Sequence, residues 1–218
     1  PDQKFAAEKL HVNHGKTEAW IILEAPPKAR VGLGFNRQME KSEVAALVAA
    51  HDSEGLLESL VFTEVTAGDA VFVPAGVPHA IESGIFVLEL QEPTDLSILL
   101  EWDGFAVDGD KDGHLNLGFD SALDALRLSP LNENESAQVV ETFKRNMGIE
   151  LIHVDAGARF FEKLKGITEP EAKRKAIGEL SQWISRVMQE NNFSYEIIII
   201  DDGSRDGSRQ TERRSITS

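Results

Sequence analysis

The chain has 218 residues, of which 41% are hydrophobic and 27% charged, and its formal net charge is −15. These proportions are those of an ordinary globular protein. Because an acidic surface repels phosphate backbones, we expect no nucleic-acid partner. The chain contains no cysteine, which excludes disulfides and thiolate metal sites. No apolar run approaches the ~20 residues of a membrane span, so we expect no membrane partner and a cytoplasmic location.

The first part of the chain predicts a helix, two strands and a second helix. Residues 1–14 are polar, with a few apolar residues at the spacing of a short helix. Lys16–Glu24 becomes apolar as a buried strand does, and Arg30–Phe35 is a second short strand. Lys41–His51 has an apolar stripe at helical spacing, with Ser42 as its N-cap.

The central stretch predicts two strands around a stiff loop. After a short helix or turn at Gly55–Leu60 and a strand at Leu60–Val65, apolar runs occur at Ala70–Val73 and Ile85–Leu90. Between these runs lies PAGVPHA, whose prolines and glycine favour a tight, rigid turn. The loop presents one imidazole, His79. From the residues alone, His79 is either a metal ligand or an ordinary surface histidine.

The segment that follows predicts a strand, a loop and a helix. Leu96–Trp102 is apolar enough for a strand. Residues 103–118 are rich in Asp and Gly, and the alternating acids from Asp108 onward suggest a calcium loop. Phe119 stands at the twelfth position, where such a loop needs Glu, so a solvated loop is the better interpretation. Phe119–Leu128 predicts an amphipathic helix.

Beyond residue 130 the pattern changes to helices alternating with strands. Ile149–Val154 and Tyr195–Ile200 are apolar on both faces, as strands buried between helices are. A helix with Pro170 in its first turn, and another at Leu180–Gln189, lie between them. We expect the two strands to lie parallel in a minimal βαβ unit.

These elements divide the chain into three parts. Residues 1–128 form the first domain, 131–208 form a small α/β appendage built of two fragment-like pieces, and 209–218 form a disordered tail. We expect the appendage to dock loosely on the first domain, because two strands and a few helices bury little surface.

Two motifs indicate a family for the first domain. GDAVFVPAGVPHAI, which contains His79, and Gly15–Trp20, GKTEAW, resemble the type I mannose-6-phosphate isomerases, which are zinc-dependent cupins. The resemblance covers residues 1–127. It implies a mainly β fold, a cupin or jelly-roll barrel with helical inserts.

The resemblance also assigns roles to four residues. By position, Glu18 and His79 are metal ligands for a Zn2+ cofactor, and Lys16 and Glu89 face the substrate as candidates for proton transfer. Without the resemblance, Lys16 and Glu18 would be interpreted as solvent-facing charges at the start of a strand.

Some expected family residues are missing. The family carries Gln-x-His-Pro-Asp, whose Gln and His are the other two zinc ligands, and this chain begins at the Pro-Asp, with Pro1. We expect both ligands just before residue 1, in a longer protein. His11 and His14 are poor substitutes, because ligand geometry is strict. Leu99 stands where the best-known members carry an arginine that is thought to polarise the sugar.

Two further resemblances lie in the C-terminal part. Residues 131–178, which include VVETFKRNMGIELIHVDA, resemble the ATP-pyrophosphatase part of GMP synthases. Residues 179–208, which include YEIIIIDDGSRDGS, resemble the first nucleotide-binding turn of family 2 glycosyltransferases. The chain lacks the phosphate loop of the first family and the later Asp-x-Asp motif of the second. We therefore expect no complete nucleotide site and suspect a chimeric chain.

The resemblance implies a function with alternatives. The first is a zinc-dependent aldose–ketose isomerase that interconverts mannose 6-phosphate and fructose 6-phosphate, so that the partner is a phosphorylated sugar. In that family the metal orients or polarises the open-chain sugar while a base moves a proton between C1 and C2. We expect this activity to be impaired here. The alternatives are a non-catalytic sugar-binding cupin and a chimeric fragment without activity.

Overall fold

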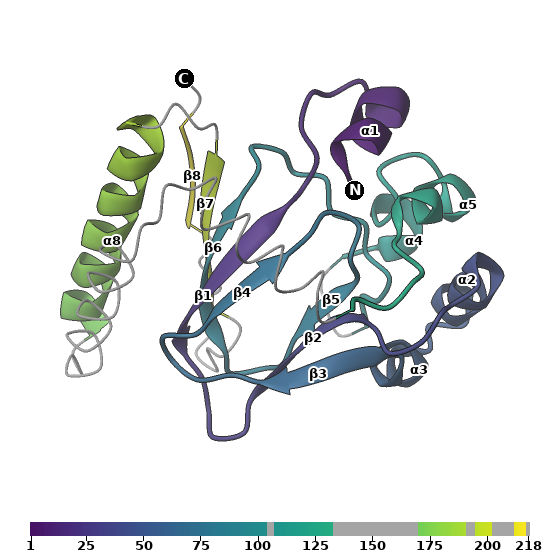
Figure 1. The fold of residues 1–218 in the computed structure, drawn as a ribbon, viewed down its shortest axis with the longest axis horizontal. Helices are drawn as coiled ribbons and strands as arrows, with labels where there is room; N and C mark the ends of the chain where they lie inside the picture. The colour runs from purple at the N-terminus through teal and green to yellow at the C-terminus, as the bar shows by residue number, and fades with distance from the viewer. Residues whose placement is uncertain (104–106, 133–169, 191–194, 202–211, 217–218) are drawn as a thin grey trace.

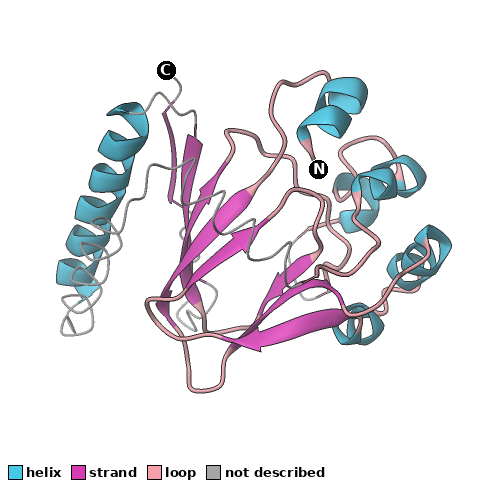
Figure 2. Ribbon diagram, in the orientation of Figure 1, coloured by secondary structure: helices cyan, strands magenta, loops and turns pink. Residues whose placement is uncertain are grey.

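Two antiparallel β-sheets form the centre of the molecule (Figures 1 and 2). The computed structural model describes residues 1–103, 107–132, 170–190, 195–201 and 212–216. The larger sheet has the strand order β4-β1-β6-β7-β8 and the smaller sheet the order β3-β2-β5. This architecture confirms a mainly β fold.

The strands are short and all their pairings are antiparallel. The larger sheet contains β1 (Glu18–Glu24), β4 (Ala70–Val73), β6 (Phe86–Gln91), β7 (Tyr195–Asp201) and β8 (Glu212–Ile216). The smaller sheet contains β2 (Arg30–Phe35), β3 (Leu60–Glu64) and β5 (His79–Ile81). The helical elements are α1 (Gln3–Phe5), η1 (Ala6–Leu10), α2 (Lys41–Ala49), α3 (Ser53–Glu58), α4 (Gly109–Asp112), α5 (Phe119–Ala122), η2 (Leu123–Ala125) and α8 (Pro170–Glu190).

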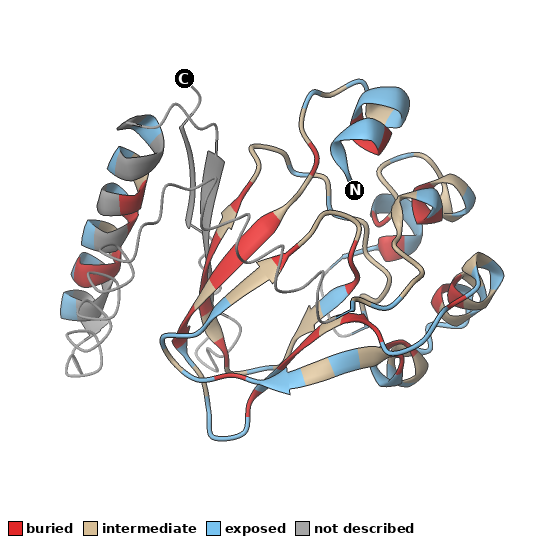
Figure 3. Ribbon diagram, in the orientation of Figure 1, coloured by how far each residue is buried: buried red, intermediate tan, exposed pale blue. Residues whose placement is uncertain are grey.

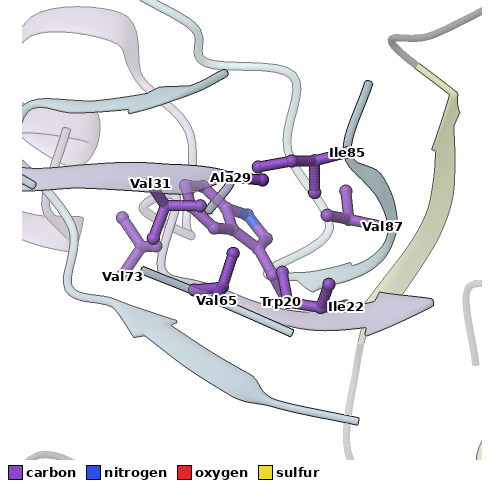
Figure 4. Close-up of a cluster of buried hydrophobic side chains, with 8 residues drawn as sticks. All are labelled: Trp20, Ile22, Ala29, Val31, Val65, Val73, Ile85 and Val87. Carbon is purple, nitrogen blue, oxygen red and sulfur yellow. The ribbon is translucent and has the colours of Figure 1, made fainter. Parts of the chain in front are cut away.

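The two sheets pack against each other through one apolar core. Trp20 of β1 lies at its centre with only 1% of its surface exposed, and Figure 4 shows side chains of both sheets around its indole. The core consists of Trp20, Ile22, Ala29, Val31, Val65, Val73, Ile85 and Val87. Burial of these side chains from water is the main force that holds the sheets together.

A second core closes one end of the sheets. Phe35, at the end of β2, and Met39 are both 1% exposed, and they pack against buried side chains of α2, α3 and η2. In Figure 3 the buried residues of α2 and α3 form a patch separate from those of β1 and β6. These helices therefore fix the end of the smaller sheet, which carries His79.

The N-terminal elements largely follow the sequence prediction. The strand β2 has the predicted bounds, and β1 and β3 differ from theirs only at the ends. The helix α2 begins at Lys41 as predicted, but its N-cap is Glu40 rather than Ser42. The predicted strand–turn–strand is more complex, because β4 and β6 both pair with β1 and β5 lies between them in the other sheet.

Two predictions for residues 96–128 are wrong. Leu96–Trp102 forms no strand; the segment is irregular, and its side chains line a cavity instead of joining a sheet. The helix predicted at Phe119–Leu128 ends early, because α5 passes into the short 3-10 turn η2 and Leu126 is extended. The apolar side chains of both segments take part in packing. Their spacing resembles that of regular elements, which is why the sequence predicts a strand and a longer helix here.

The C-terminal strands extend the sheet of the first domain. Tyr195–Asp201 is a strand, as predicted for Tyr195–Ile200, but antiparallel partners, β6 and β8, occupy both of its edges. The parallel pairing predicted for it is therefore not formed, and its expected partner, Ile149–Val154, lies outside the described residues. The structure assigns Glu212–Ile216 to β8, within the segment expected to be a disordered tail.

One helix, α8, replaces the two helices predicted between residues 168 and 190. It runs without a break from Pro170 to Glu190, and Pro170 is its first residue, where the missing N–H costs nothing. Its buried residues include Ala176, Ile177 and Ile184, which recur at helical spacing. In the view of Figure 1, α8 and the pair α2 and α3 lie at opposite ends of the molecule.

Candidate functional site

Four charged or titratable side chains gather where the two sheets face each other. Glu18 is the first residue of β1, and Lys16 precedes that strand. Glu89 lies on β6 opposite Trp20 of β1, two residue pairs along the ladder from Glu18. His79 begins β5 in the other sheet. The structure thus brings together all four residues that the sequence motifs singled out.

Glu18 and His79 approach each other from the two sheets. Glu18 Oε2 lies 3.7 Å from His79 Nε2. Only 2% of Glu18 is exposed, and Trp20 Nε1 donates a hydrogen bond of 3.1 Å to its Oε2. His79 Nδ1 lies 2.9 Å from the carbonyl oxygen of Val77. Because a carbonyl can only accept, Nδ1 carries the proton, and Nε2 presents its lone pair or its proton toward Glu18.

Lys16 joins the two carboxylates. Its ammonium donates to Glu18 Oε1 and lies 3.6 Å from Glu89 Oε1. The side chains of Glu18 and Glu89 are 2% and 6% exposed, so neither charge is well solvated. A cation between two buried carboxylates compensates part of their mutual repulsion.

Glu89 has an altered proton affinity. Burial, and after it the nearby charge of Glu18, raise the pKa of Glu89 to about 7, against the opposing effect of Lys16. At neutral pH this carboxyl is therefore close to the midpoint of its titration. Such a group can both accept and return a proton, which is the property required of a general acid–base catalyst.

The cluster borders a cavity of about 930 Å³. Lys16, Glu18 and His79 line it, as does the segment 96–102. Among the described residues that line the cavity Glu89 does not appear; its contact with the cavity runs through Lys16. Leu99 is in the wall, so the position where the family carries an arginine is a cavity position in this chain.

Arg30, another basic residue of the cavity wall, projects from the face of the smaller sheet that points away from the apolar core. Arg30 pairs with Glu82, with a distance of 2.9 Å from its Nε to Glu82 Oε1, and its guanidinium lies over the ring of Phe62. On β2 Arg30 alternates with Val31, which points into the core. Because side chains alternate along a strand, Arg30 projects from the face opposite to the one that packs on the core.

The chemistry of the donor set fits two positions of a zinc site. In a tetrahedral site with bonds of ~2.0–2.1 Å, two donor atoms lie roughly 3.3 Å apart, close to the 3.7 Å between Glu18 Oε2 and His79 Nε2. The hydrogen bond from His79 Nδ1 to a carbonyl is the usual support of a metal-binding imidazole. Within the described residues, no group of three or more His, Asp or Glu could hold a metal ion. His11 and His14 therefore do not complete the site, and the described residues fit half of it.

Sequence reasoning missed the contribution of Trp20. The indole donates to Glu18 and stands edge-on to the His79 ring, with ring centroids 5.3 Å apart. The i, i+2 spacing of Glu18 and Trp20 on a strand could have indicated that the two share a face. The cavity wall at 96–102 was also missed, because nothing in the local pattern separates a wall segment from a strand.

The Asp-rich segment contains the start of a short helix. Asp108 is the N-cap of α4, and its side chain accepts a hydrogen bond from the backbone of Lys111. The acidic residues at the start of α4 are typical of a helix N-terminus. The segment predicted to be a solvated loop therefore contains the short helix α4.

Comparisons with known proteins give two partial similarities. YvyI of Bacillus subtilis, named as a candidate mannose-6-phosphate isomerase, is 34% identical over 95 residues, which are 44% of this chain and 29% of that protein. The glutamine-hydrolyzing GMP synthase of Methylobacillus flagellatus is 56% identical over 48 residues, which are 22% of this chain and 9% of the synthase. The chain thus spans less than a third of the isomerase and less than a tenth of the synthase. The resemblances to mannose-6-phosphate isomerases and to GMP synthases are confirmed, and the resemblance of residues 179–208 to family 2 glycosyltransferases stays a prediction.

Solved structures of isomerases are also similar. The mannose 6-phosphate isomerase of Bacillus subtilis has a TM-score of 0.49 and 28% identity, covering 61% of this chain and 40% of that one. A candidate mannosephosphate isomerase of Archaeoglobus fulgidus has a TM-score of 0.48 and 21% identity, covering 62% of this chain and 39% of that one. No family model matches the chain. Across the described residues, no helix has the length and apolar character needed to cross a membrane.

Proposed function

We propose that the chain carries the site of a zinc-dependent aldose–ketose isomerase that interconverts mannose 6-phosphate and fructose 6-phosphate, with weakened activity. The observation that carries the proposal is the pairing of Glu18 with His79 beside the pair of Lys16 and Glu89, at the wall of one cavity. The similarity to an isomerase over 95 residues supports the substrate class. A phosphorylated sugar is therefore the proposed partner, and a cytoplasmic location stays a prediction.

Glu18 and His79 are the residues that would hold the zinc ion, through Oε2 and Nε2. When bound, zinc supplies polarisation of the sugar carbonyl. The described residues provide only these two ligands. Because each missing ligand lowers affinity, we expect this chain to bind zinc weakly.

The proton transfer is assigned to Lys16 and Glu89. Isomerisation moves a proton between adjacent carbons of the open-chain sugar, and a group that titrates near neutral pH does this best. Lys16 lines the cavity and contacts Glu89, which is buried behind it. In the proposed arrangement the proton passes through Lys16: the amine of Lys16, after giving a proton to the Glu89 carboxylate, takes the proton from one sugar carbon, and the reverse steps deliver a proton to the adjacent carbon and restore both groups.

Leu99 explains why we expect weak activity. A leucine at this point of the cavity wall cannot donate hydrogen bonds to developing negative charge on the sugar oxygens. We expect Leu99→Arg to raise turnover at saturating zinc, by a factor on the order of ten to a thousand if the new guanidinium reaches those oxygens. Leu96→Arg, a change in the same wall segment, is the matched control and is expected to bring no gain.

A second candidate is a sugar-binding cupin without turnover. Two observations favour it: the described residues provide only two of the four zinc ligands, and Leu99 stands in the cavity wall. It shares the cavity with the first proposal and differs only in chemistry. Binding of mannose 6-phosphate without formation of fructose 6-phosphate at any zinc concentration would support it.

A coupled assay separates the two candidates. Fructose 6-phosphate formation is measured at rising zinc with the unmodified chain, with Glu89→Gln and with Glu54→Gln. Glu54 is an exposed carboxylate in the first turn of α3. We expect slow, zinc-dependent turnover that Glu89→Gln abolishes and Glu54→Gln leaves unchanged. Equal turnover in both variants would refute the role of Glu89, and no turnover with measurable binding would refute the isomerase proposal.

A further inference from the structure

The cavity passes around the outermost strand of the smaller sheet. That strand is β5, and its three residues, His79, Ala80 and Ile81, all line the cavity. Because successive side chains of a strand point to opposite faces, the cavity borders both faces of β5. It also reaches Arg30 and Glu82, on the face that points away from the core. The cavity therefore joins the site at His79 to Arg30.

Arg30 is the more accessible of two strong bases in the cavity wall. The described lysine and arginine residues that line the cavity are Lys16 and Arg30. The side chain of Lys16 is 11% exposed and pairs with two buried carboxylates, whereas that of Arg30 is 49% exposed. Glu82 Oε1 accepts hydrogen bonds from Nε and Nη2 of Arg30, which occupy two of the five N–H groups of a guanidinium. The other three donate to none of the described residues.

An aromatic ring supports the guanidinium. The Cζ atom of Arg30 lies 4.8 Å from the centre of the Phe62 ring. Phe62 of β3 pairs with Gly32 of β2, and a Cβ at Gly32 would lie 3.1 Å from that ring. Glycine therefore leaves room for the ring beside Arg30, which shares its face of β2 with Gly32. A guanidinium that is stacked on a ring and oriented by a carboxylate loses little freedom when it binds an anion.

We propose that Arg30 binds the phosphate group of the sugar substrate and is the residue that selects phosphorylated sugars. The planar guanidinium matches phosphate oxygens with paired hydrogen bonds. Glu82 orients the guanidinium before the substrate arrives and competes with the phosphate for it. The inference deepens the proposed function and rests on it for the identity of the sugar.

The length of an open-chain hexose 6-phosphate suits this arrangement. From His79 to Glu82 the backbone makes three residue steps, which cover roughly 10 Å when extended. Three bonds of an extended chain span roughly 3.5 Å, so the six bonds from C2 to the phosphorus span roughly 7 Å. The long side chain of Arg30 covers the remaining distance. One substrate can therefore place C2 at the site and its phosphate at Arg30.

The affinity for mannose 6-phosphate tests the proposal. Its dissociation constant is measured by NMR titration without zinc. We expect Arg30→Gln to weaken binding by roughly ten- to a hundredfold. Glu82→Gln removes the competing carboxylate and should tighten binding roughly two- to fivefold. Arg37 and Glu43 form a second exposed ion pair, which does not line the cavity. Arg37→Gln and Glu43→Gln are the matched controls and should leave the affinity unchanged.

Two results would overturn the proposal. Equal weakening by Arg30→Gln and Arg37→Gln would mean that only the net charge matters. Weakening by Glu82→Gln would mean that the ion pair supports the fold and does not compete with the ligand. A loss of structure in Arg30→Gln cannot imitate the expected pattern, because the two members of the cavity pair must change the affinity in opposite directions.

Inorganic phosphate gives a second test that does not depend on the sugar. The Nε–H signal of Arg30 is assigned by its loss in Arg30→Gln and followed while inorganic phosphate is added. We expect this signal to shift with a saturable curve and the corresponding signal of Arg37 to stay in place. No shift at Arg30, or equal shifts at both residues, would overturn the proposal. Neither measurement needs turnover, so phosphate binding at Arg30 without isomerase activity would support this inference and refute the proposed function.

Discussion

Replacement of Glu89 by glutamine should stabilise the protein, and more so as the pH rises. Burial raises the pKa of Glu89 from 4.5 to about 7, so the folded state binds this proton more tightly than the unfolded state. The free energy of unfolding therefore falls as the pH rises from 4.5 to 7. Glutamine keeps the shape of the side chain and removes the cost of the buried charge.

The magnitude follows from the two pKa values. A difference of roughly 2.5 between them corresponds to about 3 kcal/mol, at ~1.4 kcal/mol per pH unit. We expect the free energy of unfolding of Glu89→Gln to exceed that of the unmodified chain by about 3 kcal/mol at pH 8 and by less than ~1 kcal/mol at pH 5. The loss of the attraction to Lys16 is already contained in this difference, because Lys16 lowers the pKa of Glu89.

Urea unfolding between pH 5 and pH 8 measures this difference. Glu54→Gln, at an exposed carboxylate, is the control and should change the free energy of unfolding by less than ~0.5 kcal/mol at every pH. A difference for Glu89→Gln that stays constant with pH would refute the raised pKa. A difference of opposite sign at pH 8 would mean that the charged carboxylate stabilises the fold.

Two further predictions concern the metal pair and the packing of α4. His79→Asn should weaken zinc binding at least tenfold in calorimetric titration, whereas His11→Asn should leave it unchanged; equal effects would remove His79 from the metal pair. Gly109→Ala should destabilise the protein by about 1–3 kcal/mol, because a Cβ at Gly109 would lie 2.0 Å from Trp102. Gly178→Ala in α8, where a Cβ meets nothing within 4 Å, should stabilise it by up to ~1 kcal/mol; thermal unfolding that ranks the two variants the other way would contradict the packing.

The sequence predicts the site better than it predicts the elements that surround it. Two short motifs, GKTEAW and PAGVPHA, are enough to indicate Lys16, Glu18 and His79, because their residue types and their order are specific. The structure then places Glu18 and His79 on opposite sheets and 3.7 Å apart. That distance depends on how the sheets pack, which no local pattern contains.

Non-local pairing accounts for the main differences. The run Tyr195–Ile200 is correctly predicted as a strand, because β-branched residues favour extended backbone. Its partner is not predictable from its own residues, since any free edge with matching length satisfies its hydrogen bonds. The edge of β6 supplies that match. The strand therefore extends the larger sheet in antiparallel pairing, instead of forming the predicted parallel βαβ unit.

Apolar composition alone also misassigned Leu96–Trp102. The same leucines that suggest a strand line the cavity instead, where they are anchored by the bond from Leu99 N–H to the carbonyl oxygen of Gly113, at 2.9 Å. A cavity wall and a buried strand need the same kind of side chain. Only the positions of neighbouring elements distinguish them.

The most direct test of the proposed function is proton exchange at the substrate. Mannose 6-phosphate is incubated with the full chain and zinc in heavy water, and deuterium at C2 is followed by proton NMR. The proposed roles of Lys16 and Glu89 predict slow, zinc-dependent incorporation that is lost in Glu89→Gln and kept in Glu54→Gln. Absence of incorporation at every zinc concentration, or equal incorporation in the two variants, would contradict the assignment of this cluster as an isomerase site.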